Sequence, residues 1–253
     1  MKGIDISHYQ GAVDWAKVKE DDVKFVFIKA TQGIGYAKVD YFRNHAPKAA
    51  GFGLHVGAYH YATFSNIPEA LAQAQYFLSV VDDYKLTYPL VLDLEENKKM
   101  VSRKQLTDAA IAFMDMIKHK GYQVMLYTSK GFLDNQLDAS RINYPLWIAR
   151  YYKELGCEAD IWQHTDKGKV NGISGNVDMN IAYRDFAPKK KPGVIGTVKV
   201  TADILNVRKG PDIKEPVVKT IKKGEEYKAY DLVRGWYNVG AGWVSNNYVT
   251  FKK

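Results

Sequence analysis

Three acidic residues end an apolar segment of the chain, in the sequence PLVLDLEEN at residues 89–97. Asp93 and Glu95 stand two positions apart, so they share one face if the segment is a strand, and Glu96 takes the other face. A carboxylate is costly to take out of water, and two carboxylates that lie close together also repel each other. We therefore expect Asp93 and Glu95 to serve a function, and Glu96 to be structural.

Two more acidic residues fall in segments with the alternating pattern of strands. Asp5 lies near the end of the segment at residues 2–7, and Asp178 lies in the segment at residues 176–183. In a parallel barrel the functional residues gather at the carboxyl ends of the strands. Closure of the barrel makes its first and last strands neighbours. Asp5 and Asp178 are therefore expected side by side, across the barrel mouth from Asp93 and Glu95.

Four converging carboxyl groups suit two kinds of chemistry. One is metal binding or metal-assisted hydrolysis by oxygen ligands. The other is hydrolysis of a glycosidic bond, which needs one protonated carboxylic acid and one charged carboxylate beside the sugar. Aromatic residues favour the sugar, because flat rings stack on sugar faces. The strand segments carry Tyr59, Tyr61, Tyr127, Trp147 and Trp162, of which alternation sends about half into the core.

Strand-like and helix-like segments alternate over the first three quarters of the chain, which is typical of a parallel sheet. The expected strands are residues 2–7, 24–31, 55–62, 89–95, 123–129, 145–151, 160–165 and 176–183. The expected helices are residues 40–50, 68–81 and 102–118, the last with Ser102 as N-cap and Gly121 just past its end. Eight strands in so short a stretch predict an α/β fold: a TIM-like, irregular (β/α) barrel with few helices in its second half.

A joint follows at FAPKKKPG, residues 186–193, where two prolines bracket three lysines. We place a barrel domain at 1–187, a linker at 188–194 and a small all-β, SH3-like barrel at 195–253, where short alternating segments are separated by Gly, Pro and Asn turns. Residues 188–253 hold 14 Lys and Arg but 6 Asp and Glu, so the whole net charge of +8 lies there. This asymmetry indicates a polyanionic partner, such as anionic wall polymers.

The segments at residues 2–15, 25–33, 57–62, 89–97, 126–129, 145–151, 161–165 and 176–183 follow one another in an order that resembles the family 25 glycoside hydrolases, the lysozymes of Chalaropsis type. The C-terminal LNVRKGP and GWVSNNYV resemble a bacterial SH3 domain. Together the two parts look like a phage endolysin or a bacterial autolysin. The resemblance implies a muramidase, which cleaves the β-1,4 bond between N-acetylmuramic acid and N-acetylglucosamine in peptidoglycan.

The resemblance also implies roles for single residues. Glu95 would be the general acid, and Asp93 would orient the N-acetyl group of the substrate. Asp5 and Asp178 match the two other acidic positions of the family. Configuration would be retained, and either the substrate acetamido group or an aspartate would attack. The residues expected to line the cleft are Tyr59, Tyr61, Tyr127, Trp162 and Gln163.

Other classes of function stay open at this point. A non-catalytic wall-binding protein would keep the barrel without activity. A zinc amidase is disfavoured, because the six histidines form no His-Glu-x-x-His motif. We expect no metal, no cofactor, no nucleic-acid partner and no membrane partner. The N-terminal sequence lacks the apolar region of a signal peptide. The expected course is therefore synthesis in the cytoplasm and action on the wall after release, through a holin if a phage encodes the protein.

Overall fold

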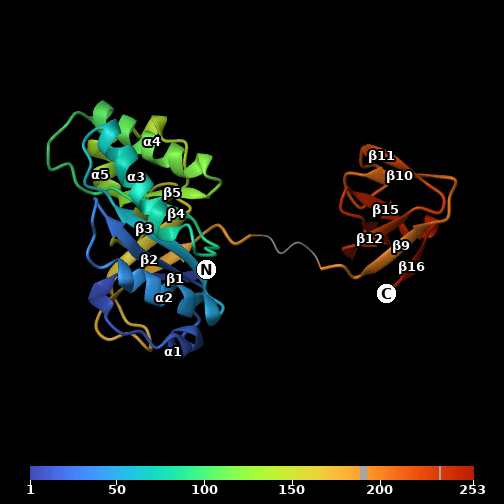
Figure 1. Cartoon of the computed structure of the whole chain (residues 1–253), viewed down its shortest axis with the longest axis horizontal. Coiled ribbons are helices and arrows are strands. Elements are labelled where there is room, and N and C mark those ends of the chain that lie inside the picture. Colours follow the sequence, from blue (N-terminus) through green and yellow to red (C-terminus); the bar gives the residue numbers. More distant parts are fainter. Residues whose placement is uncertain (189–192, 234) are drawn as a thin grey trace. The chain divides into compact units, whose positions relative to one another are not determined.

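The computed structural model describes residues 1–188, 193–233 and 235–253, and the chain forms two compact units, Met1–Ala187 and Pro188–Lys253 (Figure 1). Most of the expected linker at 188–194 lies outside the described residues.

The first unit is a closed barrel of eight strands in sequence order. The strands are β1 (Lys2–Ile6), β2 (Phe25–Gln32), β3 (His55–Tyr61), β4 (Leu90–Asp93), β5 (Val124–Ser129), β6 (Leu146–Ala149), β7 (Ile161–Gly168) and β8 (Val177–Ala182). Neighbouring strands from β1 to β7 run parallel, but β8 runs antiparallel to both β7 and β1. The barrel was predicted, whereas the direction of β8 was not. The connection at 169–176 is too short for the crossover that a parallel strand needs.

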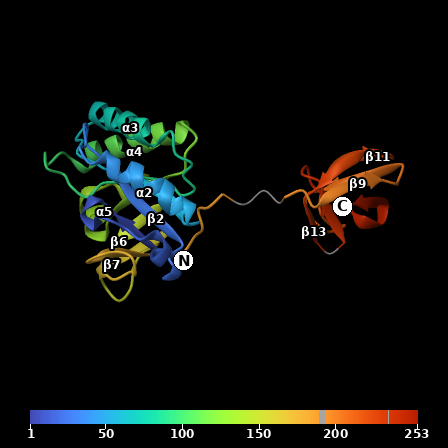
Figure 2. The same cartoon turned by 60° about the horizontal axis from the view of Figure 1, so that its bottom comes forward.

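Helices cover the outside of the barrel mainly in its first half, as predicted. They are α1 (Trp15–Glu20), α2 (Val39–Gly51), α3 (Ile67–Val81), α4 (Arg103–His119) and α5 (Lys130–Gln136). Helices α3 and α4 pack against each other (Figure 2). The Ser102 side chain caps α4 by accepting from the Gln105 backbone N–H, and Gly121 follows with a positive φ of 90°. Among the described residues no helix has both the length and the apolar character needed to cross a membrane.

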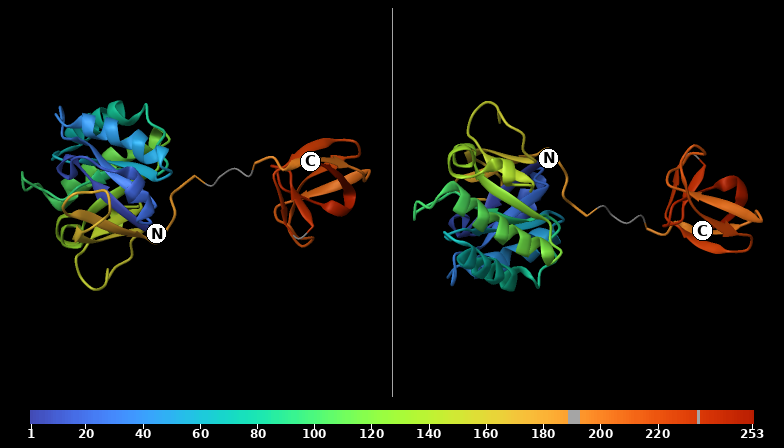
Figure 3. Two further views of the ribbon diagram at one scale, coloured as in Figure 1. Left: turned by 90° about the horizontal axis from the view of Figure 1, so that it is seen from below. Right: turned by 90° about the horizontal axis from the view of Figure 1, so that it is seen from above.

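Two hydrophobic layers result from alternation along the strands. Outward side chains such as Ile4, Ile28 and Leu92 pack under the helices. Inward side chains fill the barrel with aromatic rings, among which Phe27 stacks on Trp147 with 4.6 Å between ring centroids. The N-terminus is marked in Figure 3. It lies beside the end of β8, because the Met1 amino group donates to the carbonyl oxygen of Ala182 (2.7 Å). Because aromatic rings such as those of Phe27 and Trp147 fill it, the barrel interior is a packed core and not a channel.

The second unit is all-β, as predicted, with its own core around Val198, Val207 and Val244. One sheet has the order β11-β10-β15-β14-β13 and the other has the order β12-β9-β16. The strands are β9 (Gly196–Val200), β10 (Ile204–Arg208), β11 (Val217–Lys222), β12 (Glu226–Ala229), β13 (Asp231–Val233), β14 (Trp236–Asn238), β15 (Trp243–Ser245) and β16 (Val249–Lys252).

Candidate active site

The inward faces of the strands change from apolar to polar toward one end of the barrel. On β2 the inward residues are Phe25, Phe27 and then Lys29, and on β4 Val91 is followed by Asp93. Apolar side chains therefore close the bottom of the barrel, and charged or polar ones line its mouth. The mouth lies at the carboxyl ends of the parallel strands, where barrel enzymes hold their functional residues.

Asp5 and Asp178 occupy paired positions on β1 and β8, as expected for the first and last strands of a closed barrel. The reversal of β8 brings Asp178, near the beginning of its strand, to the mouth. The Oδ2 atom of Asp5 accepts hydrogen bonds from Asn180 Nδ2 (2.7 Å) and Gln163 Nε2 (3.0 Å). Burial and the charge of Asp178 raise the pKa of Asp5 well above its usual value. Burial also raises the pKa of Asp178, whereas its hydrogen bond with Asp5 lowers that pKa and raises the pKa of Asp5, so the proton of the pair is favoured on Asp5.

Asp93 is the last residue of β4 and its side chain is buried in the mouth. Its Oδ1 atom has no hydrogen-bond partner among the described residues. Burial raises the pKa of Asp93 well above its usual value, the charge of Glu95 raises it further, and Lys29 opposes the shift. A buried carboxyl oxygen without a partner is costly, and it is available to a hydrogen-bond donor of a ligand.

Glu95 lies beyond the end of β4, so the expectation that it closes this strand is wrong. The ladder ends where the Leu94 N–H donates to the carbonyl oxygen of Tyr127 (3.0 Å), and the chain then leaves the barrel wall. The direction of the Glu95 side chain is therefore set by the loop after β4, and not by the alternation of side chains along a strand. Its side chain reaches solvent in the cleft, yet protein atoms crowd its other sides. This partial burial raises the pKa of Glu95, and the charge of Glu96 raises it further.

Glu96 differs from the other acids in that it has a cation of its own. Its Oε2 atom lies 2.6 Å from Lys98 Nζ, and Lys98 and Tyr61 lower the pKa of Glu96. Glu96 therefore stays ionised beside Glu95 and helps Glu95 to keep its proton. Its role is electrostatic as well as structural.

Gln163 connects the aspartate pair to two tyrosines. Its side chain is buried, and its Oε1 atom accepts from the hydroxyl groups of Tyr127 (2.9 Å) and Tyr151 (2.8 Å). Because Oε1 accepts from both tyrosines, the Nε2 side of the amide must face Asp5 as a donor. One side chain thus fixes the orientation of Asp5, Tyr127 and Tyr151.

A cleft of about 800 Å³ opens at this mouth. It is lined by Glu95, Tyr127, Ser129, Lys130, Gly131, Asp134, Ala149, Arg150, Tyr151, Tyr152 and Gly156. Tyr151 and Tyr152 are largely exposed on its rim, where flat rings are open to a ligand.

Of the residues expected to line the cleft, Tyr59 and Tyr61 lie at the mouth of the barrel. Tyr59 lies among Asp5, Asp93 and Asp178, whose charges together with burial raise its pKa. Tyr61 lies at the edge of the mouth, with the Lys29 ammonium 4.5 Å from its ring centroid.

Trp162 is the exception, because it lies on the opposite face of β7 from Gln163. Its indole N–H donates to the carbonyl oxygen of Arg150 (2.7 Å), and its ring packs against the outer core. The expectation that Trp162 lines the cleft is therefore wrong, for the reason that alternation allows only one of two neighbouring residues to face inward.

The loop that carries Glu95 is fastened at two points. Asn97 donates through Nδ2 to the Val101 carbonyl oxygen (2.9 Å) and to Gln136 Oε1 (3.0 Å), and its Oδ1 accepts from the Val101 N–H (3.0 Å). Lys99 Nζ donates to Glu69 Oε1 (2.9 Å).

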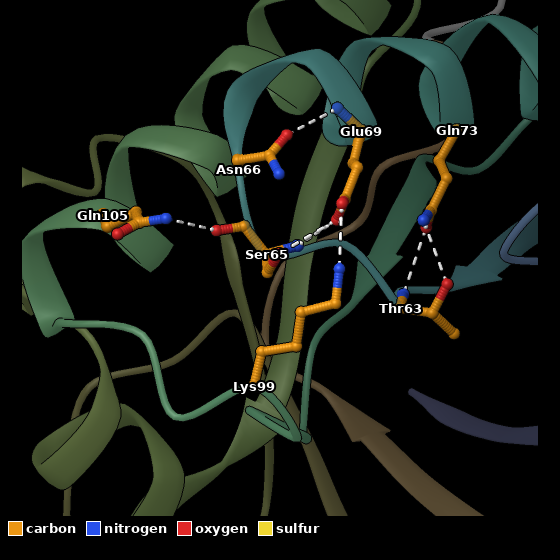
Figure 4. Close-up of polar contacts among 7 residues, drawn as sticks. All are labelled: Thr63, Ser65, Asn66, Glu69, Gln73, Lys99 and Gln105. Carbon is orange, nitrogen blue, oxygen red and sulfur yellow. Dashed lines mark hydrogen bonds and ion pairs between the residues drawn. The ribbon is translucent and has the colours of Figure 1, made fainter.

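Figure 4 shows how Glu69 is itself held in place: its Oε2 atom accepts from the backbone N–H (2.8 Å) and the hydroxyl group (3.0 Å) of Ser65. Gln105 Nε2 donates to the Ser65 carbonyl oxygen (3.0 Å), which ties the first turn of α4 to the same segment (Figure 4). The Glu95 loop is thus anchored to α3 and, through Gln136, to α5.

Several residues of the site escaped the sequence analysis, among them Lys29, Tyr151, Asn97 and Asn180. Lys29 could have been found as a charged residue in the apolar segment FVFIKAT, whose alternation places it on the inward face. Tyr151 belonged to the expected strand at 145–151, but β6 ends at Ala149, so Tyr151 lies in a loop, as Asn97 does, and loop residues carry no periodic signal.

A model of the glycosyl hydrolases family 25 matches residues 4–173, and a model of the bacterial SH3 domain matches residues 203–250. The autolytic lysozyme of Clostridium acetobutylicum is 35% identical over 183 residues, which cover 71% of this chain and 55% of that protein. The N,O-diacetylmuramidase of Chalaropsis is 30% identical over 203 residues, covering 70% of this chain and 96% of that protein.

Among solved structures, the bacterial lysozyme of Streptomyces coelicolor is similar to this chain with a TM-score of 0.66 and 30% identity. The similarity covers 73% of this chain and 93% of that protein. The residues matched by the family model include Asp5, Asp93 and Gln163.

Proposed function

The chain belongs to glycosyl hydrolases family 25, and on this basis we propose that it is a muramidase that cleaves the β-1,4 bond between N-acetylmuramic acid and N-acetylglucosamine in peptidoglycan. One observation carries the proposal: four carboxyl groups meet at the mouth of one barrel in different environments. Groups that retain protons beside groups that remain charged are what acid-catalysed cleavage of a glycosidic bond requires.

Glu95 is the general acid of this proposal. It stands at the solvent-open edge of the cleft, and burial together with the charge of Glu96 raises its pKa. It therefore donates its proton to the glycosidic oxygen as the bond between that oxygen and the anomeric carbon breaks. The leaving sugar departs as an alcohol, and Glu95 is left as a carboxylate.

Asp93 is the residue that orients the substrate acetamido group. Its buried Oδ1 lacks a partner among the described residues, so an amide N–H of the substrate can satisfy it. The acetamido carbonyl oxygen then attacks the anomeric carbon as the leaving group departs. Water, deprotonated by the Glu95 carboxylate, opens this intermediate with net retention of configuration.

In this proposal the Asp5–Asp178 pair supplies negative charge to the reaction. Positive charge develops on the sugar ring as the glycosidic bond breaks. A fixed negative charge in a partly buried site stabilises such a transition state more strongly than it would in water. Gln163 and Asn180 keep the pair in place through their hydrogen bonds to Asp5.

The test is digestion of purified peptidoglycan by the wild type and Glu95→Gln, with mass spectrometry of the products after their ends are reduced. New reducing ends at N-acetylmuramic acid, lost in Glu95→Gln and retained in the exposed control Glu154→Gln, are expected. Cleavage at amide or peptide bonds would instead indicate an amidase. Binding without cleavage by the wild type would indicate a wall-binding protein.

For the second unit, the proposed partners are anionic wall polymers. Residues 188–253 carry the whole net charge of +8, and such a charge attracts polyanions over a distance of about the Debye length. The place of action proposed for the protein is the bacterial cell wall, after release from the cytoplasm where it is made.

A further inference from the structure

Lys29 is a buried cation at the mouth of the barrel that no step of the proposed reaction uses. It lies on β2 with 9% of its surface exposed. Its Nζ atom donates to Gln32 Oε1 (2.7 Å). The same atom lies 4.5 Å from the ring centroid of Tyr61 and 5.4 Å from that of Tyr36. A hydrogen bond and two tyrosine rings thus hold the ammonium group in one place.

The strand register places this ammonium near Asp93, because Tyr61, whose ring the ammonium contacts, pairs with Asp93 across β3 and β4. Other titratable groups lie on the elements around the ammonium. The carboxyl groups come from the end of β4 and the loop after it, tyrosines come from β3 and from the loop after β2, and histidines come from the segment after β1 and from β3. They are Asp93, Glu95, Glu96, Tyr36, Tyr61, His8 and His60. Burial lowers the pKa of Lys29, and the three carboxyl groups oppose that change.

We propose that Lys29 is a positioning residue of the reaction, and that its ammonium group determines how negative charge is distributed over Asp93, Glu95 and Glu96. The inference rests on the proposed muramidase function. Its physical reason is that neighbouring carboxyl groups raise one another's pKa unless a cation lies near them. Lys98 pairs with Glu96, whereas Lys29, held at the mouth, lowers the pKa of Asp93 and Glu95 as well as that of Glu96.

The effect of Lys29 on the pKa of these carboxyl groups has a definite sign. A positive charge favours the ionised form of a carboxyl group and lowers its pKa. Lys29 therefore lowers the pH at which the charged carboxylate of the site forms, and also the pH at which Glu95 loses its catalytic proton. Removing the charge moves both limbs of the bell-shaped pH profile to higher pH.

The experiment compares pH profiles of kcat/KM on soluble glycan chains for the wild type, Lys29→Met and Lys29→Arg. In Lys29→Met both limbs are expected to move up by about one pH unit, the lower end of the effect of a nearby opposite charge. Lys29→Arg keeps the charge and is expected to keep both limbs in place. Gln32→Leu removes the hydrogen bond but not the charge, so activity falls without a shift. Lys24→Met, which changes an exposed lysine just before β2, leaves the profile unchanged.

Circular dichroism first establishes that each variant is folded, and Lys29→Gln replaces Lys29→Met if the latter is not. Unshifted limbs in the folded neutral variant, or an equal shift in Lys29→Arg, would overturn the proposal for Lys29. A wild type that releases no N-acetylmuramic acid reducing ends would instead overturn the muramidase function. The two failures are therefore distinguishable.

Discussion

At the scale of single residues, the site depends on carboxyl groups that the fold holds against their preference for water. Asp5 and Asp93 are each about 5% exposed, and burial is the largest cause of the raised pKa of both. Asp5 has two amide donors, whereas Oδ1 of Asp93 has no partner among the residues that the structure describes. The active site therefore costs stability, and Asp93 is where that cost is most apparent.

Asp93→Asn should consequently raise the melting temperature while abolishing activity. The folded pKa of Asp93 lies above its ordinary value of 3.8, so the stability of the wild type is fully present below that value and falls as pH rises through the folded pKa. Each unit of difference is about 1.4 kcal/mol. A gain of about 2–4 °C per kcal/mol is expected at neutral pH, vanishing near pH 3.8.

Thermal unfolding at a series of pH values measures this difference. The exposed Asp83→Asn serves as control and should change the melting temperature by the same small amount at every pH. If Asp93→Asn stabilised the protein equally at low and neutral pH, ionisation of Asp93 would not be the cause.

At the scale of elements, the strands bring the aspartates to the mouth but a loop presents the general acid. Glu95 follows the end of β4, and the connection to α4 is fixed mainly by side-chain hydrogen bonds. Asn97, two residues after Glu95, also joins this loop to Gln136 at the end of α5, a helix whose first residues line the cleft. The position of Glu95 therefore depends on Asn97 more than on the barrel ladder.

Asn97→Ala is expected to lower kcat on the order of 10-fold, because small displacements of a catalytic group are costly. Lys99→Ala removes the other fastening, an ion pair whose side chains are 61% and 36% exposed, and such pairs contribute little. Its kcat should stay within about 2-fold of the wild type, since the loss is about 1 kcal/mol or less of stability. Kinetics on soluble glycan would contradict this ranking if Lys99→Ala were the more damaging change.

At the scale of the whole molecule, the chain has two units with separate cores. One holds the proposed active site, and the other carries the excess positive charge. The barrel has one core under its helices and another within its strands, and the all-β unit has a third. Residues 1–187 are electrically neutral in sum, whereas residues 188–253 carry +8. A neutral catalytic unit joined to a basic one suits a substrate that is insoluble and a surface that is anionic.

Removal of residues 188–253 should lower lysis of whole cells on the order of 10-fold or more, because tethering raises the local concentration of the enzyme. Activity on soluble glycan should be retained. Replacing Lys219, Lys222 and Lys228 with glutamine in the full chain tests the effect of charge without removing the unit, since all three are exposed. That variant, which lowers the charge of the unit from +8 to +5, should reduce the salt sensitivity of whole-cell lysis. Equal losses on cells and on soluble glycan would mean that the barrel needs the second unit in order to fold.

The amino-acid sequence by itself determined the elements and much of the site. Alternation placed Asp5 and Asp93 on inward faces, and closure of an eight-strand barrel made Asp5 and Asp178 neighbours. Cap residues such as Ser102 marked helix ends. These features are local or follow from a single closure rule, so periodicity and residue type are enough to predict them.

Only the tertiary structure decided the remaining features. The reversal of β8, the outward face of Trp162 and the loop position of Glu95 depend on how strands end and pair. The charge state of each carboxyl group depends on burial and on groups distant in sequence, such as Lys29 for Asp93. Electrostatic energy is set by distance in space and by desolvation, neither of which is written in the order of the residues.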